Sequence, residues 1–131
     1  MIIKINNTGT TGEVEKQFTA GFPYLKIAFF QYPHQPEQGS PTQYRYNENK
    51  PLRQIRTKNN CDEIEVTGSM LTKDVERLFE HLFGFHIQVY RKSGKEWVQT
   101  IGTDLLSLDE QNHLGEISTV QEAPEKKRTH P

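Results

Sequence analysis

The sequence predicts a protein of the α+β class, because three observations point to strands and helices that alternate along one short chain. Between Ile64 and Ile101, apolar residues follow a strand period, then a helix period, then two further strand periods. A fainter copy of the first part of this run opens the chain at Ile2. The chain has 131 residues, of which 33% are apolar, so it provides material for one compact domain or two very small ones.

The central helix is predicted to run from Thr72, whose hydroxyl is a good N-cap, to Gly84, which suits the left-handed residue that ends a helix. One side of this helix is apolar at the spacing of helical turns and comprises Val75, Leu78, Phe79 and Leu82. The opposite side is polar and carries Lys73, Glu76, Arg77, Glu80 and His81. Such a helix is expected to bury its apolar side and to leave Glu76 and Glu80 in water.

Strands are predicted on both sides of this helix. Ile64 and Val66 alternate with polar residues before it, and Ile87 and Val89 alternate with polar residues after it. This period is typical of a strand with one buried face. A tight loop that contains Gly94 then leads into a return strand at 96–101.

The first half is predicted to repeat this order with weaker signals. A strand at 2–5 precedes a helix from about Gly12 to Ala20, which Thr10 and Glu13 open with the spacing of a capping box. A second strand follows at 25–29.

The rest of the first half and the end of the chain are predicted from turn residues. A proline-rich loop at 32–42 leads to a return strand at 43–46 and to a short helix that opens at Pro51. In the second half, the expected order is a short helix at 104–114 that stops at Gly115, and then a last strand at 116–120. Residues 121–131 are polar and charged and are expected to form a disordered tail.

An internal duplication is the favoured explanation of the similarity between the halves. Residues 3–30 match residues 64–90 at a period near 61, and after the helix one residue of shift aligns Ile27 with Ile87. The matches include the cap and the core positions of the helix, so Val14 and Phe18 correspond to Val75 and Phe79. The alternative is that any two strand–helix–strand segments look alike.

A resemblance to a known fold rests on two stretches. The segments S-L-D-E-Q-N-H-L-G-E-I-S at 107–118 and P-L-R-Q-I-R-T-K-N-N-C-D-E-I-E-V at 51–66 resemble the closing stretch of ubiquitin-like β-grasp domains. The resemblance implies two tandem β-grasp-like units, at 1–62 and 63–120, with the helices on a mixed sheet and a strand at 63–67 that both units share. The chain ends in E-K-K-R-T-H-P rather than Gly-Gly, so conjugation is not implied. The chain is also similar to uncharacterised bacterial repeat proteins, which lend it no function.

Composition excludes some classes of function and favours a cytoplasmic protein. The formal charge of −1 provides no overall field that would attract nucleic acid or a membrane surface. Cys61 is the single cysteine, so an internal disulfide is impossible and a reducing compartment fits. The opening residues alternate as a strand does and lack the apolar core of a signal peptide.

No residue pattern predicts catalysis, a cofactor or a metal site. The histidines are scattered and are expected on wet surfaces, and Cys61 lies beside Asp62, whose charge opposes formation of a reactive thiolate. Neighbouring carboxylates such as Asp109 and Glu110 are typical of solvated helix starts. We therefore expect a protein that is not an enzyme.

Three functional hypotheses follow. The leading one is a protein–protein interaction or scaffold module, because a small sheet offers edges to a partner strand. The alternative is binding of nucleic acid or another polyanion through a basic segment whose candidate residues are Tyr44, Arg45, Tyr46, Arg53, Arg56 and Lys58. The third is an enzyme with a pocket between the units near His86. Tyr90 and Trp97, close to the hairpin, predict either an aromatic contact patch or simple core packing.

Overall fold

The computed structural model describes residues 1–34 and 38–128 and confirms the α+β class. Its strands form two antiparallel sheets, with the orders β1-β3 and β2-β4-β5. The strands are β1 (Ile2–Lys4), β2 (Leu25–Phe30), β3 (Glu63–Glu65), β4 (His86–Ser93) and β5 (Glu96–Gln99). The helices are α1 (Thr11–Gly21), α2 (Leu52–Ile55), α3 (Thr72–Phe83) and α4 (Leu108–Arg128), with a 3-10 turn at Thr42–Tyr44.

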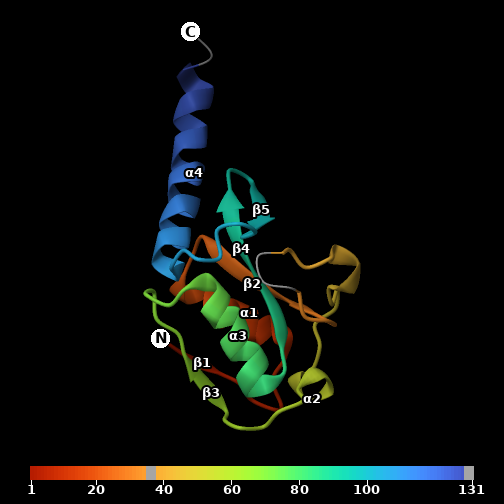
Figure 1. Ribbon diagram of the computed structural model, residues 1–131. Coiled ribbons are helices and arrows are strands. Elements are labelled where there is room, and N and C mark those ends of the chain that lie inside the picture. The colour runs from red at the N-terminus through yellow and green to blue at the C-terminus, as the bar shows by residue number, and fades with distance from the viewer. Residues whose placement is uncertain (35–37, 129–131) are drawn as a thin grey trace.

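Strand pairing joins the two halves of the chain. Strand β1 pairs with β3, where Ile3 lies opposite Ile64, and β2 pairs with β4, where Ala28 lies opposite Gln88. Figure 1 shows the β1–β3 pair at one end of the molecule and the β4–β5 hairpin at the other. The halves therefore interleave, and β4 becomes the central strand of the larger sheet.

One main core receives side chains from both halves. Val14 and Phe18 of α1 are 1% and 0% exposed, and Val75 and Phe79 of α3 are both 0% exposed in the same cluster. The matched positions of the two helices thus both point inward, as the apolar periods predicted. Burial of one such side chain stabilises the fold by about 1.5–3 kcal/mol, so these four residues anchor both helices.

Two strand predictions are wrong. The expected shared strand at 63–67 is β3, and among the described strands it pairs with β1 alone. The expected return strand at 43–46 is mostly the 3-10 turn, and only an isolated bridge between Phe30 and Arg45 links it to β2. The segment still lies along the edge of β2 opposite β4, where backbone hydrogen bonds of 2.9 and 3.0 Å join Gln31 to Tyr44 and Tyr46 to Phe29, but these contacts are too short a run to form a strand.

The end of the chain differs most from the sequence prediction. Residues expected as a short helix, a last strand and the start of a disordered tail form the single helix α4, while 129–131 lie outside the described residues. Gly115 does not stop this helix. A Cβ atom at Gly115 would lie 2.8 Å from Cβ of Tyr24 and 3.3 Å from Cγ of Arg91. The glycine is therefore needed for close approach of α4 to the sheet.

The start of α3 also differs in detail. Leu71 occupies the N-cap position without a side-chain cap, and Thr72 is the first helical residue. The buried Thr72 hydroxyl donates a hydrogen bond of 2.8 Å to the carbonyl of Leu106. Gly84 does end the helix in the left-handed conformation, with φ of 74°. The threonine thus fastens α3 to the segment that leads into α4.

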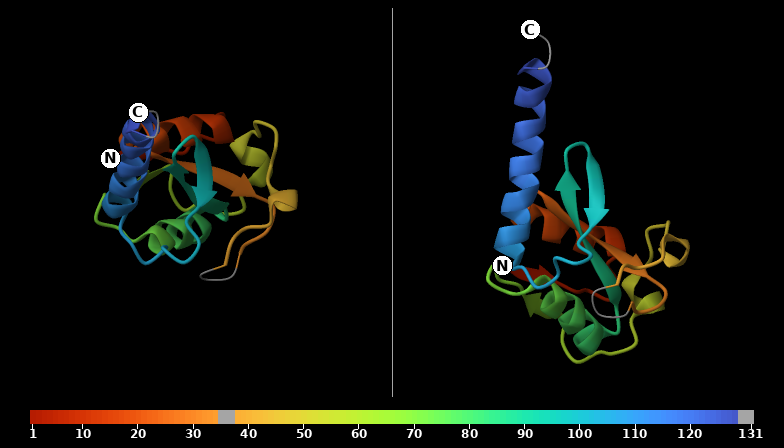
Figure 2. Two further views of the ribbon diagram at one scale, coloured as in Figure 1. Left: turned by 90° about the horizontal axis from the view of Figure 1, so that it is seen from above. Right: turned by 45° about the horizontal axis from the view of Figure 1, so that its top comes forward.

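Ser118 and Gln111 fix helix α4 to the β4–β5 hairpin, and Gln111 accepts a hydrogen bond of 2.8 Å from Arg91. Ser118 Oγ accepts a hydrogen bond from the backbone N–H of Gly94 and donates one to the carbonyl of Lys92. The two views of Figure 2 show α4 standing beside the hairpin and extending beyond the rest of the molecule. Within the described part of the chain, no helix combines the length and apolar character needed to cross a membrane.

Replacement of Gly115 by alanine is predicted to destabilise the protein. In an open helix this change stabilises by about 1 kcal/mol, but here the added methyl group meets Tyr24, and overpacking costs about 1–3 kcal/mol. Urea unfolding should show a lower free energy of unfolding for Gly115→Ala and little change for the exposed His113→Ala. A clear stabilisation by Gly115→Ala would show that α4 does not press against the sheet.

The start of α4 predicts an acid-range pH effect. Ser107 and Glu110 form a reciprocal cap, in which each backbone N–H donates to the other's side chain at 2.9 and 3.1 Å. These bonds hold the pKa of Glu110 below its usual value, so the cap's contribution is present at neutral pH and is lost as pH falls through that lowered pKa. In Ser107→Ala, an NMR titration should find the pKa of Glu110 closer to the ordinary glutamate value. The backbone N–H of residue 107 remains in this variant, so an unchanged pKa would show that the Ser107 hydroxyl takes no part in lowering it.

Candidate functional site

The outer face of the larger sheet carries an unusual group of side chains. Because side chains alternate along a strand, Leu25 and Ile27 point to the main core, and Lys26 points to the opposite face. Cross-strand pairing places Lys26 opposite Tyr90, and Lys92 opposite Trp97. Arg45 reaches the same face from the segment that bridges to the end of β2. We call the group Lys26, Arg45, Tyr90, Lys92 and Trp97 the cation–aromatic face.

The cations of this face lie over its two rings. The ammonium of Lys26 is 4.9 Å from the centre of the Trp97 ring and 5.6 Å from that of Tyr90. Lys92 lies 5.0 Å from the Trp97 ring, and Arg45 lies 5.6 Å from the Tyr90 ring. Each ring therefore receives two cations, at distances where cation–π attraction contributes about 0.5–1 kcal/mol per pair at an exposed site.

A small second core supports the face from below. Ala28, Phe30 and Tyr90 are buried together there, and Tyr44 and Trp97 pack against them. The Tyr44 ring also meets the Tyr32 ring edge to face at 4.9 Å, and Tyr32 is 57% exposed. Phe30 and Tyr90 are thus buried, Tyr44 and Trp97 are half-buried, and Tyr32 is exposed.

Positive charge is concentrated on this face. Burial lowers the pKa of Lys26, and Arg45 and Lys92 lower it further by repulsion, while Glu15 partly offsets them. Burial also raises the pKa of Glu15, against the attraction of Arg45 and Lys26. Two of the cations, Arg45 and Lys26, attract the Glu15 carboxylate, and Lys92 acts on Lys26, so the group of three cations and one carboxylate has a net formal charge of +2 because 3 − 1 = 2.

The predicted basic segment does not form one surface. Tyr44 and Arg45 belong with the outer face of the sheet, but Tyr46 packs against the main core. Arg53 is exposed on α2, and Lys58 is exposed in the loop after it. The segment turns through α2 between these residues, so its charges point to different parts of the molecule.

Arg56, which was predicted to bind a polyanion, has a structural role. Its side chain is only 1% exposed, and its guanidinium lies 5.3 Å from the centre of the Phe83 ring. It donates hydrogen bonds to the carbonyl of Lys58 at 2.8 Å, to the side chain of Asn7 at 3.0 Å and to the carbonyl of Cys61. These bonds tie the loop after α2 to the start of the chain, so this guanidinium is not available to a phosphate.

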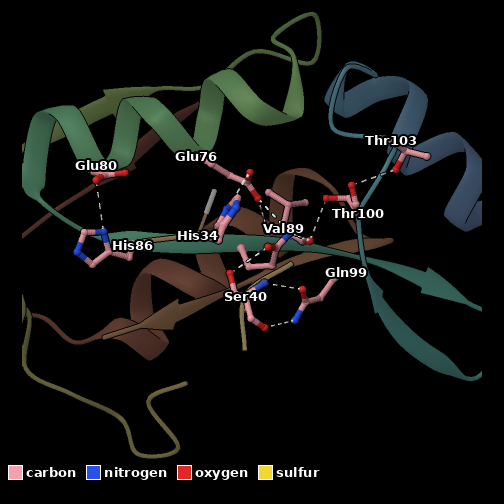
Figure 3. A network of polar contacts seen from close by, with 10 residues as sticks. His34, Ser40, Glu76, Glu80, His86, Val89, Gln99, Thr100 and Thr103 are labelled. Atoms are coloured by element: carbon pink, nitrogen blue, oxygen red, sulfur yellow. Dashed lines mark hydrogen bonds and ion pairs between the residues drawn. The ribbon is translucent and has the colours of Figure 1, made fainter. Parts of the chain in front are cut away.

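A second feature is a small pocket beside α3, about 60 Å³ in volume. Figure 3 shows Glu76 reaching from α3 toward β4 with His34 beside it, and Glu80 facing His86. His34 Nε2 lies 3.4 Å from Glu76 Oε1, and His86 Nδ1 lies 3.7 Å from Glu80 Oε1. Lys73, Arg77 and Asp104 complete the polar lining.

Glu76 was expected in water, but it is 7% exposed and completes the edge of β4. Pairing with β5 begins only at Tyr90, and Glu76 Oε2 accepts the N–H of the preceding Val89 at 2.9 Å. It also accepts a hydrogen bond of 3.2 Å from Gln88. The carboxylate thus takes the place of a neighbouring strand. This structural role explains why the Glu76 side chain is buried.

The same polar network holds Ser40, which lies in the proline-rich loop at 32–42. Gln88 accepts a hydrogen bond from the hydroxyl of Ser40, and the side chain of Gln99 forms two bonds with the Ser40 backbone, at 2.9 and 2.8 Å. Figure 3 shows this network running from α3 across β4 to Gln99. The network therefore fixes the part of the loop around Ser40 next to the cation–aromatic face.

The pocket provides no complete set of groups for catalysis or metal binding. His86 Nδ1 is buried and makes no hydrogen bond with the described residues, because 3.7 Å to Glu80 allows only an electrostatic contact. Within the described part of the chain, no three His, Cys, Asp or Glu side chains are arranged to hold a metal ion. Cys61 lies beyond the pocket lining, so neither histidine is placed to activate it.

Sequence reasoning missed the residues that matter most on the outer face. Lys26 follows from the alternation of β2, and Lys92 follows from the hairpin register with Trp97, so both could have been assigned to it. Arg45 could not be placed, because its position depends on a bridge to β2 that no local pattern indicates. Glu76 was missed because helical period alone assigns it to water.

Comparisons with protein-family models, with curated proteins and with solved structures found no match to this chain. The function of this chain is therefore inferred from the geometry of the cation–aromatic face and of the pocket beside α3.

The structural role of Glu76 gives a direct prediction. Glu76→Ala leaves the buried N–H of Val89 without its acceptor, so the free energy of unfolding should fall by about 2–3 kcal/mol. Glu80→Ala, one turn along the same helix, removes a half-exposed carboxylate and should change it by less than about 0.5 kcal/mol. Equal losses in urea unfolding would contradict this role.

Proposed function

We propose that this protein is a non-catalytic interaction module that docks a partner protein on the cation–aromatic face. The observation that carries the proposal is the placing of the half-buried Trp97 and Arg45, with the buried Tyr90 beneath them, on one sheet face that points away from the core helices. Tryptophan, tyrosine and arginine are the side chains that most often dominate the binding energy of protein interfaces. The second core beneath them keeps the face preformed, which lowers the entropy lost on binding.

Nucleic-acid binding is the weaker candidate for this face. Single-stranded nucleic acid needs open ring faces for its bases and separate cations for its phosphates. Here the cations Lys26, Arg45 and Lys92 lie over the rings themselves. The remaining candidates of the basic segment, including Arg53 and Arg56, face elsewhere or are consumed in the fold.

An enzyme is also the weaker candidate. A pocket lined by His86 and converging polar groups was the feature that would favour catalysis, and such a pocket lies beside α3. Its volume is about 60 Å³, and a second hollow lined by His86, Phe85 and Tyr46 has a volume of about 260 Å³. Both volumes are below the roughly 300–1,000 Å³ of pockets that enclose a small-molecule ligand. Its most buried carboxylate, Glu76, completes the edge of β4.

We also propose that the two halves arose by duplication. Ile3 and Ile64 match in the sequence and face each other in the first sheet, and Ala28 and Gln88 do so in the second. Two copies related by a two-fold axis would meet in this way. The β-grasp-like assignment of each half rests on the sequence resemblance alone, and the cytoplasmic location rests on the single Cys61 and on composition.

The docking face can be tested by comparing three baits in extracts of the native cells. Trp97→Ala together with Arg45→Ala removes a ring and a cation from the face, while Arg53→Ala removes an exposed cation from α2. Quantitative mass spectrometry should find a protein enriched by the native chain and by Arg53→Ala but lost with the double variant.

Reconstitution with the purified partner should then give a dissociation constant at least about tenfold weaker for the double variant, provided that circular dichroism shows it folded. A partner that binds the double variant as tightly as the native chain would overturn the proposal. A partner lost only with Arg53→Ala would place the interface on α2.

A further inference from the structure

We propose that the segment docked on the cation–aromatic face is acidic, an extended stretch of the partner protein rich in aspartate and glutamate. This inference rests on the proposed function and names the chemistry of the partner. The chain as a whole carries a formal charge of −1, so the face is a local exception and not part of a generally basic surface. Complementary charge between patches is a main source of specificity in protein recognition.

The cations share two rings, since Lys26 and Arg45 both lie over Tyr90 while Lys26 and Lys92 both lie over Trp97. Burial lowers the pKa of Lys26 most, repulsion from Arg45 and Lys92 lowers it further, and the Glu15 carboxylate offsets this repulsion. A further carboxylate placed among these groups relieves their mutual repulsion. Groups held under such repulsion at a surface are more common at binding sites than in parts of a protein that serve stability alone.

The side chains of the face are better suited to bind the carboxylates of a protein than the nucleobases of a nucleic acid. Arg45 lies over the Tyr90 ring, and Lys92 lies over the Trp97 ring. Long cationic side chains placed in this way pack their apolar stems on the protein and keep their charged groups at the surface. A guanidinium fixed in this way offers paired N–H donors that match a carboxylate. The rings beneath are covered, so a planar base finds no free surface on which to stack.

The strand directions favour an extended ligand. Lys26 lies on β2, Lys92 lies on β4, and Arg45 lies on the segment that bridges to the end of β2, so the three cations are spread over neighbouring segments rather than along one strand. Strands lie about 4.8 Å apart, and alternate side chains of an extended peptide recur at about 6.6 Å. An extended acidic segment that crosses the sheet can therefore bring successive carboxylates to successive cations.

Trp97 provides the measurement, because it is the only tryptophan of the chain and lies in the proposed site. The probe is a synthetic peptide of about ten residues in which Glu alternates with Ser, which reaches roughly 33 Å when extended. The matched control peptide carries Gln in place of Glu. Titration should change the Trp97 emission with the Glu peptide and leave it unchanged with the Gln peptide, and added salt should weaken the binding.

Three charge reversals locate the binding by fluorescence anisotropy of the labelled peptide. Arg45→Glu and Lys26→Glu should each weaken the affinity about tenfold or more, and Arg53→Glu on α2 should change it less than about twofold. An equal loss with Arg53→Glu would mean diffuse attraction and would overturn the inference. So would failure of the Glu peptide to bind the native chain.

A thymidine oligonucleotide of similar length is the competing polyanion. Tighter binding of the oligonucleotide than of the Glu peptide, lost on Arg45→Glu, would overturn the inference in favour of nucleic acid. The two proposals fail separately. If the native partner still requires Trp97 and Arg45 while the Glu peptide does not bind, the docking face stands and only its acidic ligand is refuted.

Discussion

The pairing of β2 with β4 is the constraint on which the rest of the structure depends. It joins strands from the two halves and makes β4 the centre of a three-stranded sheet. Because alternate side chains of both strands, such as Ile27 and Val89, point to one side, α1 and α3 share the main core there. The intervening side chains, which include Lys26, Phe30 and Tyr90, must then gather on the other side. The cation–aromatic face is thus a consequence of how the halves interleave.

Two close contacts keep that sheet in place. Glu76 completes β4 where β5 stops, and its partner Gln88 connects it to the segment around Ser40. Gly115 lets α4 approach the sheet from the core side next to Tyr24. Neither residue belongs to the cation–aromatic face, but each supports a different part of the three-stranded sheet. The face is therefore supported on the side of α3 and on the side of α4.

Local patterns predicted the elements well, and their partners poorly. The apolar periods identified α1, α3, β2 and β4, because Val14, Phe18, Val75 and Phe79 repeat at helical spacing and lie in the core. The pairing of β1 with β3 was missed, since register between distant strands depends on tertiary packing and leaves no local signal.

Glycine was the most misleading signal. Gly84 and Gly115 both look like helix ends, but only Gly84 adopts the left-handed conformation. Gly115 is required by a neighbour that is distant in sequence, and no local rule separates the two cases. The outer face was predicted in part, because Tyr44, Arg45 and Trp97 were singled out. Arg56 was not recognised as structural, because its hydrogen-bond partners come from two separate segments, the loop at 58–61 and the start of the chain at Asn7.

The most direct measurement of the central claim is the set of interstrand NOEs from β2 in the folded protein. The structure predicts backbone NOEs from Lys26, Ile27 and Ala28 to residues 88–90, with Ala28 opposite Gln88. Two self-contained units would instead connect these residues to 43–46. NOEs of the second kind, without those to β4, would contradict the interleaved fold and remove the basis for the docking face.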